Sequence, residues 1–135
     1  MSKVQLYAFR LQPGQDLKKE IQRVVVEKQV KAGWINTCVG SLQTFHIRFA
    51  NQPVPTTGSG HFEILGLSGT LSVHGSHIHI IISDSSGKTI GGHLTEGCLV
   101  YTTAEIVITA CGDFEFTRAN DGTTQWQELQ VKNLK

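Results

Sequence analysis

The segment from Gly75 to Asp84 constrains the fold of this chain more than any other part of it. Isoleucines at positions 78, 80 and 82 alternate there with His77, His79 and Ile81. Alternation with a period of two is typical of a β-strand, because successive side chains point to opposite sides. The segment therefore predicts a strand that buries its isoleucines and carries two histidines together on the other face.

A third histidine, His93, follows on the strand that returns after the turn at Asp84–Gly87. An odd-length turn with Gly87 in the left-handed conformation places His79 directly opposite His93. A two-residue turn would instead pair His93 with Ile80 and move it to the other face. The first register predicts three imidazoles on one face of a hairpin.

These three histidines are the candidate ligands of a metal ion. Three neutral imidazoles and one open position form a recurring catalytic metal site, so His77, His79 and His93 are predicted to bind one divalent ion, zinc first. The donors also suit Ni²⁺, Cu²⁺ and Fe²⁺, and the alternative is a polar sheet face without metal. Catalysis would also need a general acid or base, for which Glu63 and Glu96 are the candidates.

The remaining pattern predicts a single α+β domain over residues 1–135. Residues 16–31 have helical spacing, with Asp16 as the N-cap and Gly33 as the stop. About seven strand-like segments accompany this helix, and the one at residues 34–50 is expected to bulge at Gly40. Residues 51–60, which hold two prolines and two glycines, predict an exposed loop. We therefore expect an antiparallel sheet with one main α-helix packed on it.

Charge and cysteine content limit the classes of partner and the compartment. The formal net charge of +1 gives no basic surface for direct binding of nucleic acid or of an anionic membrane. No apolar stretch approaches the roughly 20 residues that cross a bilayer. The three cysteines are widely spaced and odd in number, which indicates free thiols in a reducing compartment. We expect a cytoplasmic protein.

Three motifs in the middle and the second half of the chain carry a family resemblance. They are the run Gly-His-Phe-Glu-Ile-Leu-Gly-Leu-Ser-Gly at 60–69, Gly-Gly-His-Leu at 91–94 and Thr-Ala-Glu-Ile-Val-Ile at 103–108. Together they resemble the plants-and-prokaryotes conserved (PPC) domain, over residues 4 to 131. The resemblance implies an antiparallel sheet with a packed helix, assembled as a homotrimer. It also implies that His61, Phe62 and Glu63 shape a subunit contact or a partner surface.

Two departures separate this chain from the plant members of that family. Plant members join the domain to AT-hook motifs that bind DNA, and the domain then mediates self-assembly and contact with transcription factors. This chain has no Gly-Arg-Pro hook, and it has His61 where the plant motif has Arg. It resembles the stand-alone prokaryotic-type members, many of which are labelled as DNA-binding.

The predicted function is a trimeric metal-binding and interaction module with a three-histidine site. One alternative is a metal-dependent enzyme that acts on a small molecule. A further alternative is a transcription-linked protein that reaches DNA through a protein partner.

Overall fold

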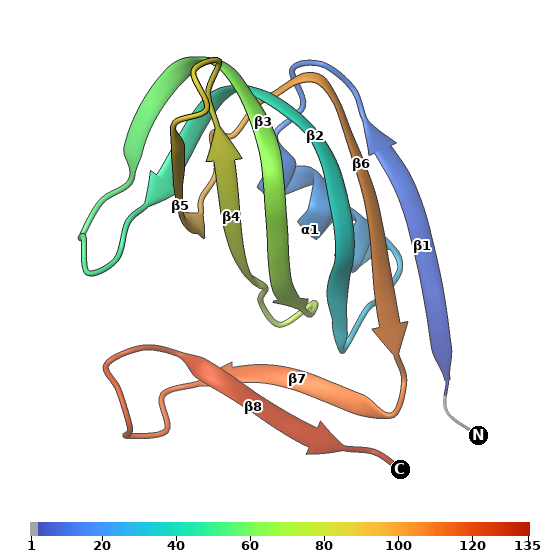
Figure 1. The fold of residues 1–135 in the computed structure, drawn as a ribbon. Helices are drawn as coiled ribbons and strands as arrows, with labels where there is room; N and C mark the ends of the chain where they lie inside the picture. Colours follow the sequence, from blue (N-terminus) through green and yellow to red (C-terminus); the bar gives the residue numbers. More distant parts are fainter. Residues whose placement is uncertain (1–2) are drawn as a thin grey trace.

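The computed structural model describes residues 3–135, and Figure 1 shows a curved sheet with one helix against it. The elements in chain order are β1 (Val4–Leu11), α1 (Leu17–Glu27), β2 (Gly33–Arg48), β3 (Thr56–Leu71), β4 (His77–Ser83), β5 (Thr89–Leu94), β6 (Val100–Cys111), β7 (Phe114–Ala119) and β8 (Glu128–Asn133). Six strands form an antiparallel sheet in the order β1-β6-β2-β3-β4-β5, and β7 pairs with β8 in a second, two-stranded sheet. The α+β class with one main helix is confirmed, with eight strands in these residues.

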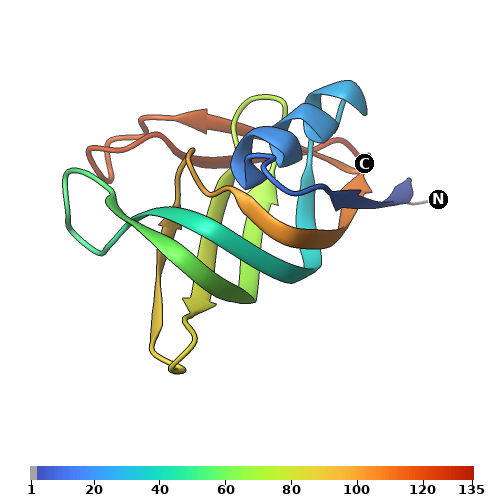
Figure 2. The ribbon, with the colours of Figure 1, turned by 90° about the horizontal axis from the view of Figure 1, so that it is seen from above.

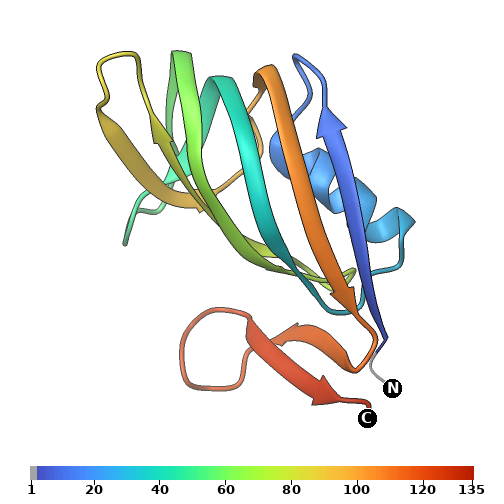
Figure 3. The same cartoon turned by 45° about the vertical axis from the view of Figure 1, so that its right-hand side comes forward.

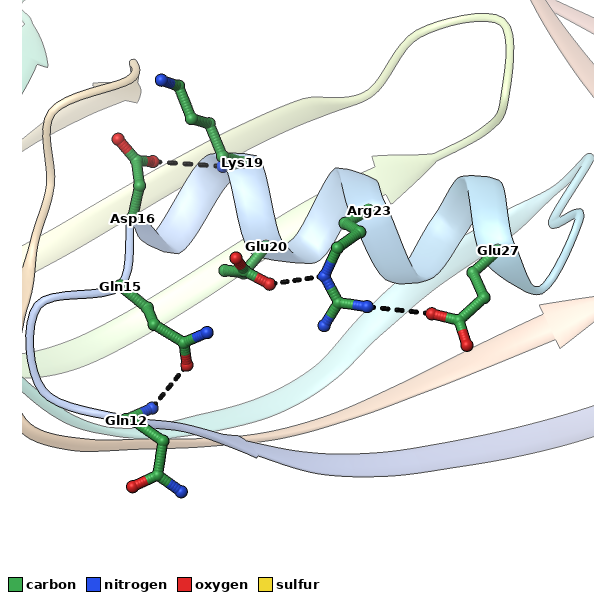
Figure 4. A network of polar contacts seen from close by, with 7 residues as sticks. All are labelled: Gln12, Gln15, Asp16, Lys19, Glu20, Arg23 and Glu27. Atoms are coloured by element: carbon green, nitrogen blue, oxygen red, sulfur yellow. Dashed lines mark hydrogen bonds and ion pairs between the residues drawn. The ribbon is translucent and has the colours of Figure 1, made fainter.

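Helix α1 covers one face of the sheet, as the two turned views show (Figures 2 and 3). It begins where the sequence predicts, because the Asp16 carboxylate accepts a hydrogen bond from the Lys19 backbone N–H at 3.1 Å. Its exposed side carries ion pairs that join Arg23 to Glu20 and Glu27 (Figure 4). With 11 residues, α1 is far too short to cross a membrane, and residues 3–135 contain no membrane-spanning helix.

Two predicted boundaries are wrong. The helix ends at Glu27 and not near Gly33, because Gln29 adopts the left-handed conformation with a φ of 53° and so breaks the helical hydrogen-bond pattern. The expected loop at 51–60 is shorter, because β3 already begins at Thr56, where it pairs with the end of β2. Its two prolines lie in the part that remains a loop.

The hydrophobic core lies between α1 and the face of the sheet that the helix covers. Four apolar residues of the helix and three of β4 are fully or almost fully buried in it: Leu17, Ile21, Val24, Val25, Ile78, Ile80 and Ile82. The alternation read from the sequence is confirmed, since Ile81 and the histidines at 77 and 79 are exposed on the opposite face. Burial of the isoleucines therefore determines which way the two histidines point.

Strand β2 bends round so that its last residues meet a third partner. It pairs with β6 and β3 along its length, and its end also pairs with β5, Ile47 with Leu94 and Arg48 with His93. Its pairing with β6 shifts between Gly40 and Leu42, which confirms the predicted bulge. Strands β2, β3, β4 and β5 therefore form a closed ring of neighbours at this end of the sheet.

Gly92 allows β5 to approach the end of β2. A Cβ atom at this position would lie 2.7 Å from the Arg48 carbonyl oxygen and 2.9 Å from Cγ2 of Ile47. Any larger residue would therefore force the two strands apart. The glycine thus places the neighbouring His93 beside Arg48.

Candidate metal centre

The turn between β4 and β5 determines whether the three histidines meet. The Asp84 carboxylate accepts hydrogen bonds from the backbone N–H groups of Ser86 and Lys88, both at 2.9 Å. Gly87 is left-handed with a φ of 84°. His79 consequently lies directly opposite His93. The odd-length turn is confirmed, and the two-residue alternative, which pairs His93 with Ile80, is wrong.

The three imidazoles lie against one another. The ring centroids of His77 and His79 are 4.9 Å apart, those of His77 and His93 4.8 Å, and those of His79 and His93 5.7 Å. One ligand nitrogen from each ring lies within 4.8 Å of the other two. Three nitrogens bound tetrahedrally to one zinc ion lie roughly 3.3 Å apart, given Zn–N bonds of about 2.0–2.1 Å. Small rotations of the side chains would therefore bring this donor set to zinc geometry.

The surroundings of the cluster keep the imidazoles of His77 and His93 unprotonated. Partial burial lowers the pKa of His93 to about 4, with further lowering by the charges of His77 and Arg48. Desolvation by the neighbouring groups also lowers the pKa of His77, although part of its side chain stays exposed, with smaller effects from His79 and Arg118. Among residues 3–135, no group is hydrogen-bonded to the three rings. His77 and His93 therefore present free lone pairs at neutral pH, the form that binds metal.

A cavity of about 670 Å³ adjoins the cluster. Its walls come from the start of α1, from the ring of strands and from the β7–β8 hairpin, which lies across one end of the sheet (Figures 1 and 3). The lining residues include His77, His93, Arg48, Arg118 and Trp126. A smaller cleft of about 180 Å³ is lined by His77 and His79 of β4 and by residues 68–70 of β3. Each of the three histidines therefore lines at least one of these two spaces.

Sequence reasoning missed the two arginines that line the larger cavity. The guanidinium of Arg48 lies over the Trp126 ring, 5.7 Å from its centroid, and Arg118 donates a hydrogen bond to the Thr70 hydroxyl at 3.0 Å. Arg48 reaches the histidines through the β2–β5 pairing and Arg118 through the last hairpin. Neither contact leaves a signal in the neighbouring sequence.

The structure does not bring the two expected carboxylates to the cluster. Glu63 lies opposite Ser83 at the far end of β4, and exposed Glu96 lies 3.9 Å from the Lys19 ammonium group. Neither residue lines the cavity. The one carboxylate that does is Glu128, whose Oε2 accepts a hydrogen bond from Thr124.

The motif at 61–63 lies away from the histidine cluster. The exposed ring of His61 stacks on Tyr101 with a centroid distance of 4.6 Å. Phe62 packs edge-on against Phe45 at the border of the core, 5.1 Å between centroids. Of the three residues, His61 and Glu63 are exposed.

Comparison with known proteins identifies the family. Residues 1–112 match the model of the Plants and Prokaryotes Conserved (PCC) domain. The chain belongs to this family. The match ends just before β7, so the hairpin that closes the cavity lies beyond the matched part of this PCC-domain protein.

Relatives of this PCC-domain protein differ greatly in length. It is 41% identical over 131 residues to part of the bifunctional protein GlmU from Synechococcus sp. (strain JA-3-3Ab). That alignment covers 97% of this chain and 21% of the relative, so the chain spans about a fifth of that protein's length.

Two solved structures share the whole PCC fold. A hypothetical protein from Salmonella cholerae-suis superposes with a TM-score of 0.95 at 37% identity, over 98% of this chain and 96% of the other. A protein from Archaeoglobus fulgidus, described as metal-containing, superposes with a TM-score of 0.82 at 26% identity, over 93% of both chains.

Proposed function

We propose that this PCC-domain protein binds one divalent metal ion per chain, zinc first, through His77, His79 and His93. The observation that carries the proposal is the convergence of three ligand nitrogens to within 4.8 Å. The description of the Archaeoglobus fulgidus relative as metal-containing supports it. When bound at such a site, zinc supplies a Lewis acid and lowers the pKa of a coordinated water.

Metal analysis of protein purified without chelator tests this site. We expect about one zinc per chain, or one equivalent taken up on titration, and loss of that equivalent in His79→Ala and His93→Ala. His61→Asn is the matched control, because it removes an exposed histidine from outside the cluster. Wild-type protein that neither retains nor takes up metal would contradict the proposal, as would a variant that binds as tightly as the wild type.

The cavity favours a second candidate function, that of a metal-dependent enzyme acting on a small molecule. Catalytic zinc sites keep one coordination position open, and His77 and His93 both line a cavity large enough for a metabolite. Glu128 is the carboxylate in that cavity and takes the acid–base role for which Glu63 and Glu96 were considered. A survey of simple esters and phosphate esters with zinc-loaded protein tests this function. We expect turnover that falls in both His79→Ala and Glu128→Gln.

We also propose that the protein assembles as a homotrimer, with the exposed face of the sheet as its contact. Three large apolar side chains from the neighbouring strands β2, β3 and β4 support this proposal: Val39 is 61% exposed, Leu65 60% and Ile81 48%. Light scattering should give the mass of three chains, and Leu65→Glu should release monomers. A monomeric wild-type protein would overturn the proposal.

A further inference from the structure

The cavity beside the histidine cluster has a charge pattern that the metal site does not require. Three cationic side chains line it, and each comes from a different part of the chain: Lys18 from α1, Arg48 from β2 and Arg118 from β7. Glu128 is the one carboxylate in the lining. The cavity wall therefore carries a formal excess of positive charge although the whole chain is close to neutral.

These three cations lack acidic partners within the described residues. No carboxylate of residues 3–135 forms an ion pair with Lys18, Arg48 or Arg118, and all three side chains are partly buried. The exposed Arg23 on the outer side of α1, by contrast, is bracketed by two glutamates (Figure 4). Partly buried cations gathered in one concave site focus a positive potential that attracts anions.

Both arginines are held in place by neutral groups. Arg48 lies over the Trp126 ring and donates one hydrogen bond, at 3.4 Å, to the Gln52 carbonyl. Arg118 donates one of its five N–H groups to the Thr70 hydroxyl. Each guanidinium therefore keeps most of its donors for a ligand, and a guanidinium fork fits carboxylate and phosphate oxygens in pairs.

A divalent ion on the cluster would add to this positive charge. Three neutral imidazoles leave the charge of +2 on the ion without compensation, unlike a site with carboxylate or thiolate ligands. The cavity lining offers one compensating group, the carboxylate of Glu128. An external anion would balance both the ion and the cations of the wall.

We propose that the cavity binds a small organic anion, whose carboxylate or phosphate group is held by Arg48 and Arg118. The inference rests on the proposed metal function, because His77 and His93 line the same cavity. It adds the class of ligand that this cavity binds. The volume of about 670 Å³ suits a metabolite-sized molecule. The Trp126 ring in the wall provides an apolar surface for the organic part of the ligand.

Calorimetric titration of the full chain with inorganic phosphate and with succinate tests the proposal. Both probes are added to zinc-loaded and to chelator-treated protein, and zinc content is measured on the same samples. We expect at least one probe to bind, and Arg48→Gln and Arg118→Gln to weaken it about tenfold or more, because each removes charged hydrogen bonds. Lys132→Gln is the matched control, since it removes a charge from the same hairpin but outside the cavity.

The outcomes separate this inference from the metal proposal. Arginine-dependent binding of phosphate, of succinate or of both supports the inference and identifies the acid group. If zinc does not bind but the arginine-dependent anion binding persists, the metal proposal fails alone. The inference is overturned if zinc binds and neither probe does at millimolar concentration, or if Lys132→Gln weakens binding as much as the cavity variants. Arg48→Lys and Arg118→Lys keep the charge, and they replace the Gln variants if those unfold.

Discussion

At the scale of single residues, two imidazoles of the histidine cluster are held in the neutral form that the proposed metal site requires. Partial burial and neighbouring positive charges oppose protonation of His77 and His93, so the apoprotein holds two neutral imidazoles against each other. Protons consequently compete weakly with a metal ion near neutral pH. A surface patch of solvated histidines would have no such preference.

The titration of His93 is the direct check on this arrangement. In zinc-free protein followed by NMR, we expect the His93 ring to titrate near pH 4 and not near 6.5. Between pH 4 and pH 6.5, His93 is more protonated in the unfolded chain than in the folded protein. The free energy of unfolding should therefore fall as the pH is lowered through this window, and His93→Asn should reduce that dependence. A midpoint near 6.5 would contradict the burial argument.

The convergence of the three histidines could be predicted from the sequence, because their positions follow from local rules. Strand periodicity places His77 and His79 on one face, and a turn with left-handed Gly87 sets His93 opposite His79. The surroundings of the ligands could not be predicted in this way. Arg48 and Arg118 reach the site through long-range pairing and hairpin placement, which leave no pattern in the neighbouring sequence.

At the scale of elements, the contact between the end of β2 and β5 gives the site its shape. The bend of β2 lets one strand pair with β6, β3 and β5, and this brings the Arg48 backbone beside His93. The sequence predicted the bulge near Gly40. It did not indicate the strand that β5 would approach, since any strand end could occupy that place.

Gly92→Ala tests the importance of this contact. A methyl group would lie 2.7 Å from the Arg48 carbonyl oxygen, so the strands must separate. We expect a loss of about 1–3 kcal/mol in the free energy of unfolding and weaker zinc binding. Gly66→Ala is the matched control, because its Cβ would lie at an ordinary 3.5 Å from Ile81. Urea unfolding and zinc titration of both variants measure these effects. If Gly66→Ala lowers stability and zinc affinity as much as Gly92→Ala, the close approach of β5 to β2 has no special importance.

At the scale of the whole molecule, the three cysteines report on the integrity of the fold. Cys38, Cys98 and Cys111 are all buried and unpaired. Burial raises the pKa of Cys38 to about 12, with a smaller contribution from Glu105, and burial raises that of Cys98 to about 11. The thiolate, which is the reactive form, is therefore scarce at Cys38 and Cys98 in the folded protein.

Thiol labelling at pH 8 should therefore measure unfolding. In native protein, an aromatic disulfide reagent should react slowly, at a rate that follows the opening of the structure. In urea, all three thiols should react at once, which provides the control for reagent and stoichiometry. Fast reaction of even one thiol in native protein would show that the sheet opens locally near that residue.

The cavity takes its walls from positions as far apart as Lys18 and Glu128. During synthesis, the ribosome therefore releases all three histidines well before the last hairpin has emerged. A nascent chain at that stage has all three histidines of the cluster but lacks Arg118, Trp126 and Glu128. On the proposals above, the metal site is therefore complete before the anion site, which also needs the β7–β8 hairpin.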